Sequence, residues 1–234
     1  MSISENLMDI EERIQKACDR AGRKREEVTL ICVSKTKPVS AVEEAYSAGQ
    51  RNFGENKVQE ILDKAPALPE DIKWHMIGHL QRNKVKQVIE RAALIHSVDS
   101  FRLAEEINIQ ALKRGITVPI LMEVNAAGEE SKFGVSVEDA FPLAEQVSEL
   151  KGLRLCGLMT VAPYVAVSEE NRPVFRRIRQ LAVDIDSQNI DNISMDRISM
   201  GMTGDFETAI EEGATLIRVG TGIFGERQYQ NGTH

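Results

Sequence analysis

The stretch "LICVSKTKP", Leu30–Pro38, decides how the rest of the chain is interpreted. An apolar, partly β-branched run of this kind is typical of a buried strand. It ends in Lys35, and an ammonium group is costly in a dry interior, so such a side chain is normally at the surface or put to use. Successive side chains of a strand point to opposite faces. One face therefore carries Thr29, Ile31, Val33 and Lys35, and the other carries Leu30, Cys32 and Ser34.

Short apolar runs recur along the chain and alternate with segments of helical periodicity. Strands that alternate with helices form a parallel sheet, and eight such strands close a (β/α)8 barrel. We therefore predict an α/β fold, a TIM-type barrel that residues 1–234 form as a single domain, with an open doubly wound sheet as the alternative. The eight strand candidates are Val28–Ser34, Arg51–Phe53, Ile72–Ile77, Leu94–Val98, Pro119–Val124, Leu153–Met159, Arg197–Ser199 and Thr215–Val219.

An extra helix is expected at the N-terminus, before the alternation begins. Ser2 and Glu5 fit a capping box, and Gly22 can end this helix. Its apolar face consists of Leu7, Ile10, Ile14 and Ala17. The segment Asp99–Gly115 shows the same helical periodicity with a cap and a stop. Pro142 leaves the boundary of the helix before the sixth strand undefined, because proline interrupts the hydrogen-bond ladder.

Composition narrows the functional classes. The 234 residues are 42% hydrophobic and carry a net charge of −7, which fits a globular protein and argues against general affinity for nucleic acid. No run of about 18 apolar residues is present, and the first residues lack a signal-peptide layout, so we expect no membrane segment. Cys18, Cys32 and Cys156 suggest neither a disulfide framework nor a zinc site. A cytoplasmic location is expected.

The loops after the last two predicted strands are rich in small residues. "SMGMTGDFETAIEEG" places Ser199, Gly201 and Thr203 in a turn before a helix, and "LIRVGTGIFGER" ends the eighth strand with Gly220 and Thr221. Small residues let backbone amides approach a ligand closely, and a helix N-terminus adds a positive dipole. The loops after strands seven and eight are the usual phosphate site of this barrel. Together they predict a bound phosphate.

Two basic side chains are expected at the same barrel mouth. Lys35 ends the first strand, where it can bind an anion or form a Schiff base with a carbonyl, unless it only extends into solvent. Arg218 shares a strand face with Leu216 and Gly220, so we expect it to point into the mouth, unless it pairs with a carboxylate. These features describe a pocket for an anionic ligand with a carbonyl group. Pyridoxal 5′-phosphate fits, and so does a phosphorylated sugar aldehyde.

Seven motifs, spread over nearly the whole chain, resemble those of the pyridoxal-phosphate homeostasis proteins, single-domain relatives of the barrel of alanine racemase. In chain order they are "VSKTKP", "FGENKVQE", "WHMIGHLQRNK", "SKFG", "GLMT", "SMGMTGD" and "RVGTGIFG". Gly222 is a small departure, since alanine is the commoner residue at this position of the family. The resemblance implies binding of pyridoxal 5′-phosphate and a part in vitamin B6 and amino-acid balance, without a firmly established reaction.

The resemblance also implies roles for individual residues. Lys35 matches the lysine that forms the Schiff base, and Arg218 matches the arginine that faces the pyridine nitrogen. Asn56 and Met159 would line the ring. The phosphate positions would be Ser199, Gly201, Gly220 and Thr221, with Thr203 as a neighbour.

Other basic and metal-binding candidates carry less weight. Lys37, Lys84 and Lys132 could contact the cofactor transiently, but each is better explained as a solvated lysine. "HLQRNKVK" lacks the aromatic residues of a nucleic-acid site. His75 and His79 straddle a strand end and do not share a helix face, so a metal pair is not expected.

The sequence favours a carrier over an enzyme. A pyridine nitrogen that faces Arg218 stays neutral and stabilises a carbanion poorly. Racemisation needs an acid/base group on each face of the ring, and the sequence offers Lys35 and, as a substitute for the second, Tyr164. We expect no counterpart of the C-terminal domain that supplies a tyrosine in alanine racemases. The expected partners are the cofactor and PLP-dependent apo-enzymes, and a monomer is expected although a homodimer is compatible. A weak amino-acid racemase and a Schiff-base aldolase remain alternatives.

Overall fold

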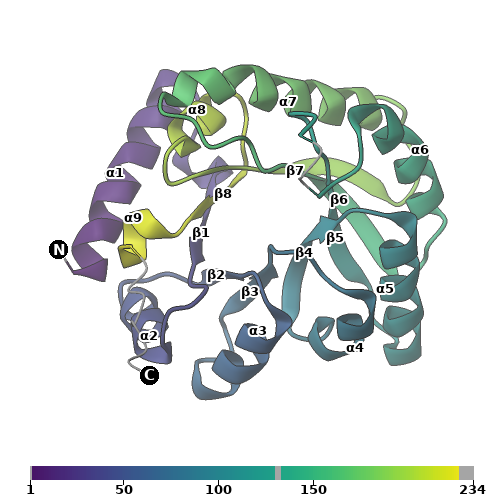
Figure 1. The fold of residues 1–234 in the computed structure, drawn as a ribbon, viewed down its shortest axis with the longest axis horizontal. Helices are drawn as coiled ribbons and strands as arrows, with labels where there is room; N and C mark the ends of the chain where they lie inside the picture. Colours follow the sequence, from purple (N-terminus) through teal and green to yellow (C-terminus); the bar gives the residue numbers. More distant parts are fainter. Residues whose placement is uncertain (1, 130–132, 227–234) are drawn as a thin grey trace, which may run out of the picture.

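The computed structural model describes residues 2–129 and 133–226 and contains a closed barrel of parallel strands, with β8 paired to β1 (Figure 1). The predicted (β/α)8 barrel is confirmed, and the open doubly wound sheet is wrong. The strands are β1 Thr29–Val33, β2 Asn52–Glu55, β3 Lys73–Met76, β4 Ala92–Val98, β5 Val118–Glu123, β6 Leu153–Met159, β7 Ile193–Met202 and β8 Leu216–Val219.

Helices surround the barrel and occupy the connections between the strands (Figure 1). They are α1 Ile3–Arg20, α2 Val39–Ser47, α3 Val58–Lys64, α4 Val85–Val88, α5 Phe101–Arg114, α6 Val137–Ser148, α7 Arg172–Asp186, α8 Phe206–Glu211 and α9 Thr221–Phe224. Short 3₁₀ turns lie at Arg25–Glu27, Ala65–Ala67, Arg82–Lys84 and Ser168–Asn171.

Most strand ends differ from the sequence prediction by one or two residues, and two elements differ more. β7 is much longer than the expected 197–199, because the exposed Asp196 interrupts the apolar pattern while the backbone pairs with β6 from Ile193 and with β8 as far as Met202. α6 runs through Pro142 without ending there. Ser136 starts this helix by accepting a hydrogen bond from the Asp139 N–H at 3.1 Å.

The extra N-terminal helix α1 is present, and it covers the place where the first and last strands meet. The predicted capping box between Ser2 and Glu5 forms, and Gly22 follows the helix at φ +65°. α1 packs against α8 and α9 (Figure 1). Asn6 Nδ2 donates a hydrogen bond to the Ile223 carbonyl of α9 at 2.8 Å. The helix therefore fixes the segment that follows β8.

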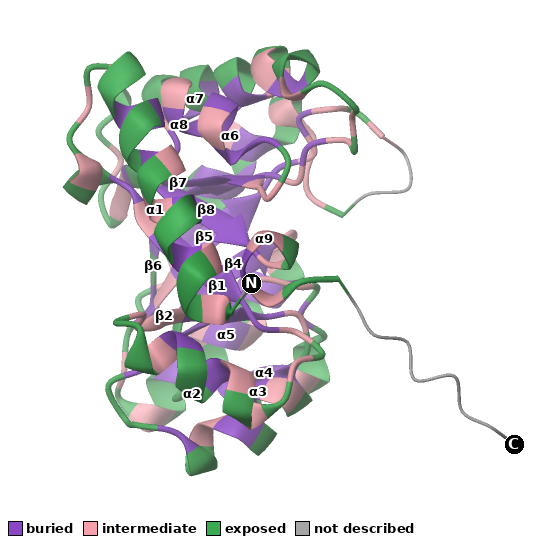
Figure 2. Ribbon diagram, turned by 90° about the vertical axis from the view of Figure 1, so that its left-hand side faces the viewer, coloured by how far each residue is buried: buried purple, intermediate pink, exposed green. Residues whose placement is uncertain are grey.

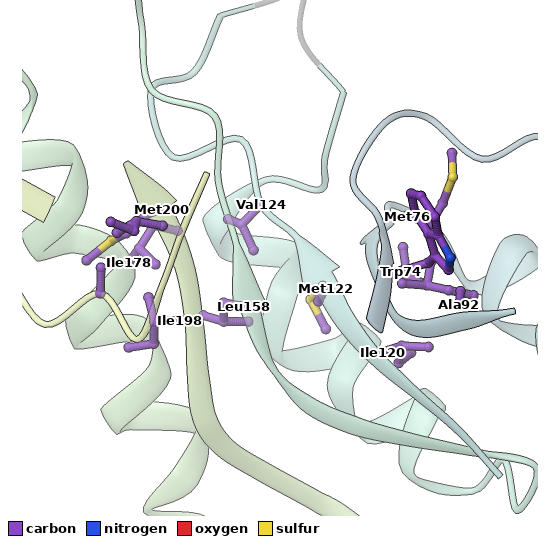
Figure 3. Packing of buried hydrophobic residues seen from close by; sticks show 14 of the residues in the cluster. Trp74, Met76, Ala92, Ile120, Met122, Val124, Leu158, Ile178, Ile198 and Met200 are labelled. Atoms are coloured by element: carbon purple, nitrogen blue, oxygen red, sulfur yellow. The ribbon is translucent and has the colours of Figure 1, made fainter. Parts of the chain in front are cut away.

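Two clusters of buried apolar residues hold the barrel together, and Figure 2 shows that the strands are largely buried. The larger layer lies between the sheet and the helices; Figure 3 shows part of it, where Leu158 and Ile198 of the sheet lie near Ile178 of α7. A small cluster lies inside the barrel and consists of Ile31, Leu94, Leu121, Cys156, Met159 and Leu216. Ile31 belongs to the inner cluster and Cys32 to the outer layer, so the predicted alternation along β1 is confirmed.

Closure of the barrel brings the ends of β1 and β8 together. β1 and β8 pair in parallel, with Ile31 opposite Arg218 and Cys32 opposite Val219. Lys35 follows β1 and Gly220 follows β8, so both lie at the same end of the barrel.

Cys18, Cys32 and Cys156 are buried and free. In the two described segments, no helix is both long and apolar enough to cross a membrane.

We predict that α1 is an integral part of the fold. Ile14 is fully buried on its inner face, whereas Met8 on the same helix is 64% exposed. Ile14→Ala should lower the free energy of unfolding by about 2–4 kcal/mol, because it removes buried methyl groups and leaves a cavity. Met8→Ala is the matched control and should change it by less than about 0.5 kcal/mol. Equal effects in denaturant unfolding would contradict the packing described here.

Candidate functional site

A cavity of ≈ 560 Å³ lies at the end of the barrel where the strands end. Its wall includes residues one or two positions after the ends of β1, β2, β3, β6, β7 and β8, and this end of a (β/α)8 barrel is the one that carries chemistry. The predicted cofactor-binding residues that line this cavity together are Lys35, Asn56, Thr203, Arg218, Gly220 and Thr221.

The turn after β1 brings two lysines to the cavity. Lys35 is half-buried and lines the cavity wall. The Lys37 ammonium donates hydrogen bonds to the carbonyls of Phe224, at 2.8 Å, and of Gly225 and Glu226, both at 3.2 Å. Lys37 is therefore not the solvated lysine that the sequence suggested. It ties the end of β1 to the end of α9.

The loops after β7 and β8 meet at one side of the cavity. The Thr203 hydroxyl oxygen accepts hydrogen bonds from the backbone N–H groups of Gly220 and Gly222, both at 3.3 Å. Asp205 fixes the first of these loops, because its carboxylate accepts from the Met202 N–H at 2.6 Å. The two loops thus converge as predicted, with two backbone N–H groups and a hydroxyl side by side.

The remaining three predicted residues, Met159, Ser199 and Gly201, are buried and do not line the cavity. Met159 belongs to the apolar cluster inside the barrel. Gly201 has φ +87°, and a Cβ atom there would lie 2.5 Å from the Cβ of Ala209, so glycine lets β7 pass close to α8. Ser199 lies beneath Arg218. Direct contact of these three residues with a ligand stays a prediction.

Arg218 points from β8 into the mouth, as predicted, and is 5% exposed. Its Nη1 donates to the Ser199 hydroxyl oxygen at 2.6 Å, and its Nη2 donates to the Thr160 carbonyl at 2.8 Å. No carboxylate of the described residues forms a salt bridge with it. The alternative that Arg218 only pairs with a carboxylate is therefore wrong. The buried Arg218 guanidinium faces the cavity and has no salt-bridge partner among the described residues.

A chain of hydrogen bonds runs from Arg218 across the barrel interior. Ser199 Oγ lies 2.9 Å from His96 Nδ1, His96 Nε2 lies 2.9 Å from His75 Nδ1, and His75 Nε2 lies 3.1 Å from Asn52 Oδ1. The amide oxygen of Asn52 only accepts, and the Arg218 guanidinium only donates. Every link therefore donates in the direction from Arg218 to Asn52. Both imidazoles carry their proton on Nε2.

Burial sets the charges along this chain. It lowers the pKa of His75 to about 3 and holds the pKa of His96 well below its ordinary value, and nearby cationic groups add to both shifts. Burial also lowers the pKa of Arg218, to about 10, against the opposing effect of Glu123 and Asp205. Near pH 7 the imidazoles are therefore neutral and the guanidinium is charged.

Glu123 is a buried ionisable residue that the sequence analysis did not single out. It is the last residue of β5, so it lies at the same end of the barrel as Lys35. Burial raises the pKa of this carboxyl to about 7; repulsion from Asp99 adds to the shift, and attraction to Arg218 opposes it. A charged residue at the end of an apolar run was the signal that drew attention to Lys35, and the same signal occurs in "PILMEV". The histidines His75 and His96 gave no comparable signal.

The other sequence candidates lie in different surroundings. Lys84 does not line the cavity, and Lys132 lies outside the described residues. His75 is buried in the hydrogen-bonded chain, whereas the exposed His79 lies 3.2 Å from a carboxylate oxygen of Asp99. Tyr164 lines the edge of the cavity with its side chain fully in solvent.

Comparison with known proteins places this geometry in a family. The family model described as "Alanine racemase, N-terminal domain" matches residues 6–228. A pyridoxal phosphate homeostasis protein of Aquifex aeolicus is 46% identical over 230 residues, which are 98% of this chain and all of that protein. One of Escherichia coli is 41% identical, with 97% of both chains covered. This chain belongs to the pyridoxal phosphate homeostasis protein family.

Solved structures agree with this assignment. PipY of Synechococcus elongatus with PLP bound has a TM-score of 0.82 and 36% identity, and the match covers 96% of this chain and all of that one. An alanine racemase of Clostridium difficile has a TM-score of 0.76 at 12% identity and shares the fold alone. The resemblance inferred from the seven motifs is confirmed.

We predict that Ser199 stabilises this family member through its two hydrogen bonds. Ser199→Ala would leave an Arg218 N–H and His96 Nδ1 unpaired in the interior and should lower the free energy of unfolding by about 1–3 kcal/mol. Ser97 is an unusually good control, since its buried hydroxyl has no hydrogen-bond partner among the described residues. Ser97→Ala should be neutral or stabilising in the same denaturant titration. A loss as large as that of Ser199→Ala would contradict the assignment.

We also predict a pH dependence of stability from Glu123. Its pKa is raised from 4.5 to about 7, so the folded protein keeps a proton that the unfolded chain loses. The stabilising contribution is complete below the unfolded pKa and is lost as the pH rises through the folded pKa, with a slope on the order of 1 kcal/mol per pH unit. Unfolding of the wild type and of Glu123→Gln, followed across this window, should diverge in slope. Parallel curves would contradict the prediction.

Proposed function

We propose that this chain binds pyridoxal 5′-phosphate in the mouth cavity, holds the aldehyde as a reversible Schiff base on Lys35, and acts in vitamin B6 and amino-acid homeostasis without catalytic turnover. One observation carries the proposal: a single cavity brings together Lys35, the buried Arg218 and the converging loops at Thr203 and Gly220. The names of the curated relatives and the PLP-bound PipY structure support it.

The residues of the cavity fit the chemical groups of this cofactor. The hydroxyls of Thr203 and Thr221 are suited to phosphate oxygens, and the backbone N–H groups of Gly220 and Gly222 hold the Thr203 hydroxyl in place by donating to its oxygen. A Cβ atom at residue 220 would lie 3.3 Å from the Val33 carbonyl oxygen, so glycine lets the loop after β8 lie close to the end of β1. The cationic Arg218 favours a ligand with negative charge or a lone pair. These groups would bind and orient the ligand.

Lys35 supplies the reversible bond. Its uncharged amine would add to the aldehyde carbon, the oxygen would leave as water, and a C=N bond would replace C=O. Hydrolysis reverses each of these changes and returns the aldehyde, so no oxidant or reductant is needed. A protein that holds a reactive aldehyde in this way buffers its free concentration and can release it to PLP-dependent apo-enzymes.

Two features support a carrier over a racemase. If Arg218 meets the ring nitrogen, as the family resemblance implies, the nitrogen stays unprotonated and withdraws electrons weakly. A second acid/base group is also needed opposite Lys35, and the side chain of Tyr164 is fully solvated at the cavity edge. We further propose that this chemistry takes place in the cytoplasm, where free cysteines such as Cys32 persist.

We predict that the purified protein develops a yellow absorption band when it is titrated with pyridoxal 5′-phosphate. Lys35→Ala should abolish the band, because the amine that forms the C=N bond is gone. Lys84→Ala is the control; it removes a lysine that does not line the cavity and should leave the titration unchanged.

A band that persists in Lys35→Ala would assign the bond to another lysine and contradict the proposal. A wild type that stays colourless would contradict it as well, and turnover of a sugar phosphate without added cofactor would then favour the aldolase. Interconversion of alanine enantiomers that depends on Lys35 would identify a racemase.

A further inference from the structure

Both neighbours of Lys35 in the sequence are held by one group of charged side chains on the outer side of the barrel. We call Glu55, Glu60 and Lys64 the Lys64 cluster. The Ser34 hydroxyl donates to Glu55 Oε1 at 2.7 Å, and the Thr36 N–H donates to Glu60 Oε2 at 2.6 Å.

The Lys64 ammonium joins these contacts. It donates to Glu55 Oε1 at 2.8 Å, to Glu60 Oε2 at 3.0 Å and to the Ser34 carbonyl at 2.9 Å. All three members of the cluster come from β2 and α3, within the stretch "ENKVQEILDK". One short segment therefore holds the backbone on both sides of Lys35.

The turn that the cluster holds is strained. Thr36 has φ +64°, a left-handed conformation that is rare for a β-branched residue. Strained conformations persist only where the surroundings over-determine them, and they concentrate at functional sites. The bond from the Thr36 N–H to Glu60 acts directly on this residue, and the Ser34 contacts fix the residue two positions earlier.

The cluster is too deeply buried for an ordinary surface ion pair. The side chains of Glu55 and Lys64 are 0% and 8% exposed, and that of Glu60 is 20% exposed. Burying charges costs so much solvation that such pairs rarely improve stability over apolar packing. Stability alone therefore does not explain why these charges lie behind this turn.

The two carboxyl groups of the cluster have pKa values shifted in opposite directions. Burial raises the pKa of Glu55 to about 7, and its Oε2 is buried without a hydrogen-bond partner among the described residues. Burial acts in the same direction on Glu60, but the Thr36 N–H and Lys64 outweigh it and hold the pKa of Glu60 below its ordinary value. Glu60 is thus the ionised partner of Lys64 and the acceptor for the strained residue.

We propose that Glu60 and Lys64 are positioning residues that hold the turn Ser34–Lys37 so that Lys35 is presented to the cavity. Neither residue lines the cavity, whereas Lys35, Thr36 and Lys37 do, so the cluster acts only through the backbone. The inference rests on the proposed function of Lys35 and adds the residues that set its place.

The test compares two substitutions of Glu60. Glu60→Leu removes the acceptor of the Thr36 N–H, whereas Glu60→Gln keeps a carbonyl oxygen there. Glu60→Leu should weaken binding of pyridoxal 5′-phosphate by about 10-fold or more, the worth of a lost hydrogen bond to a charged group, and Glu60→Gln should weaken it by less than about 3-fold. Asp63→Leu, an exposed carboxylate on the same helix, is the matched control.

A second readout does not require the cofactor. Amide hydrogen exchange at Thr36 in the cofactor-free protein reports how often this turn opens. Glu60→Leu should speed this exchange by about 10-fold or more, and Asp63→Leu should not change it. Thr36 exchange that is unchanged in Glu60→Leu would overturn the inference. A wild type that fails to bind the cofactor would instead count against the proposed function, and the exchange data would still test the turn.

Thr36→Gly provides a test through rescue. Glycine adopts a positive φ without strain, so the turn should then depend less on Glu60. The double variant Thr36→Gly/Glu60→Leu should recover most of the affinity that Glu60→Leu loses. Affinity that drops further in the double variant would overturn the inference. Should Glu60→Leu not fold, the single variant Thr36→Gly decides: a raised midpoint of thermal unfolding supports the strain, and a lowered midpoint contradicts it.

Discussion

The candidate site depends on the pairing of β1 with β8, which closes the barrel. This register sets Ile31 opposite Arg218, so that the turn with Lys35 and the loop with Gly220 emerge side by side. Without this pairing the same strand order would form an open sheet with β1 and β8 as its two edges, and the lysine and the glycine loop would lie far apart. Contacts outside the sheet reinforce the closure, since α1 packs on α8 and α9 and Lys37 binds carbonyls at the end of α9. The helix α1, which precedes the barrel, therefore helps to hold the site residues in place.

The buried positive charge of Arg218, beneath the mouth of the barrel, favours an anionic ligand. Arg218 is nearly buried, and its direct hydrogen-bond partners in the described chain are neutral, the Ser199 hydroxyl and the Thr160 carbonyl. The imidazoles behind Ser199 are neutral as well, and their fixed tautomers align the dipoles so that the oxygen of Ser199 faces the guanidinium. Dipoles solvate a buried charge without cancelling it. The positive potential therefore remains available at the cavity.

The sequence predicted the fold and the outline of the site well, and physical reasons explain where it failed. Alternation along "LICVSK" identified the inner face of β1, and small residues in the last two loops identified the convergence at Thr203 and Gly220. Ser199 was expected in the turn after the seventh strand, but β7 continues to Met202 and keeps it in the sheet. Met159 was expected at the ring from the family resemblance alone, and both residues are buried and do not line the cavity. Their depth follows from barrel closure. The pairing of His75 with His96 and the hold of Glu60 on Thr36 join residues far apart in sequence, and no local pattern reveals them.

The most direct measurement identifies the lysine that carries the cofactor. The protein is incubated with pyridoxal 5′-phosphate and reduced with borohydride, and the modified peptide is identified by mass spectrometry. We expect a stoichiometric adduct on Lys35 and none on Lys37, whose ammonium donates hydrogen bonds to three carbonyls. An adduct on Lys37 or on another lysine in place of Lys35, or no adduct at all, would contradict the central claim that barrel closure builds a pyridoxal phosphate site around Lys35.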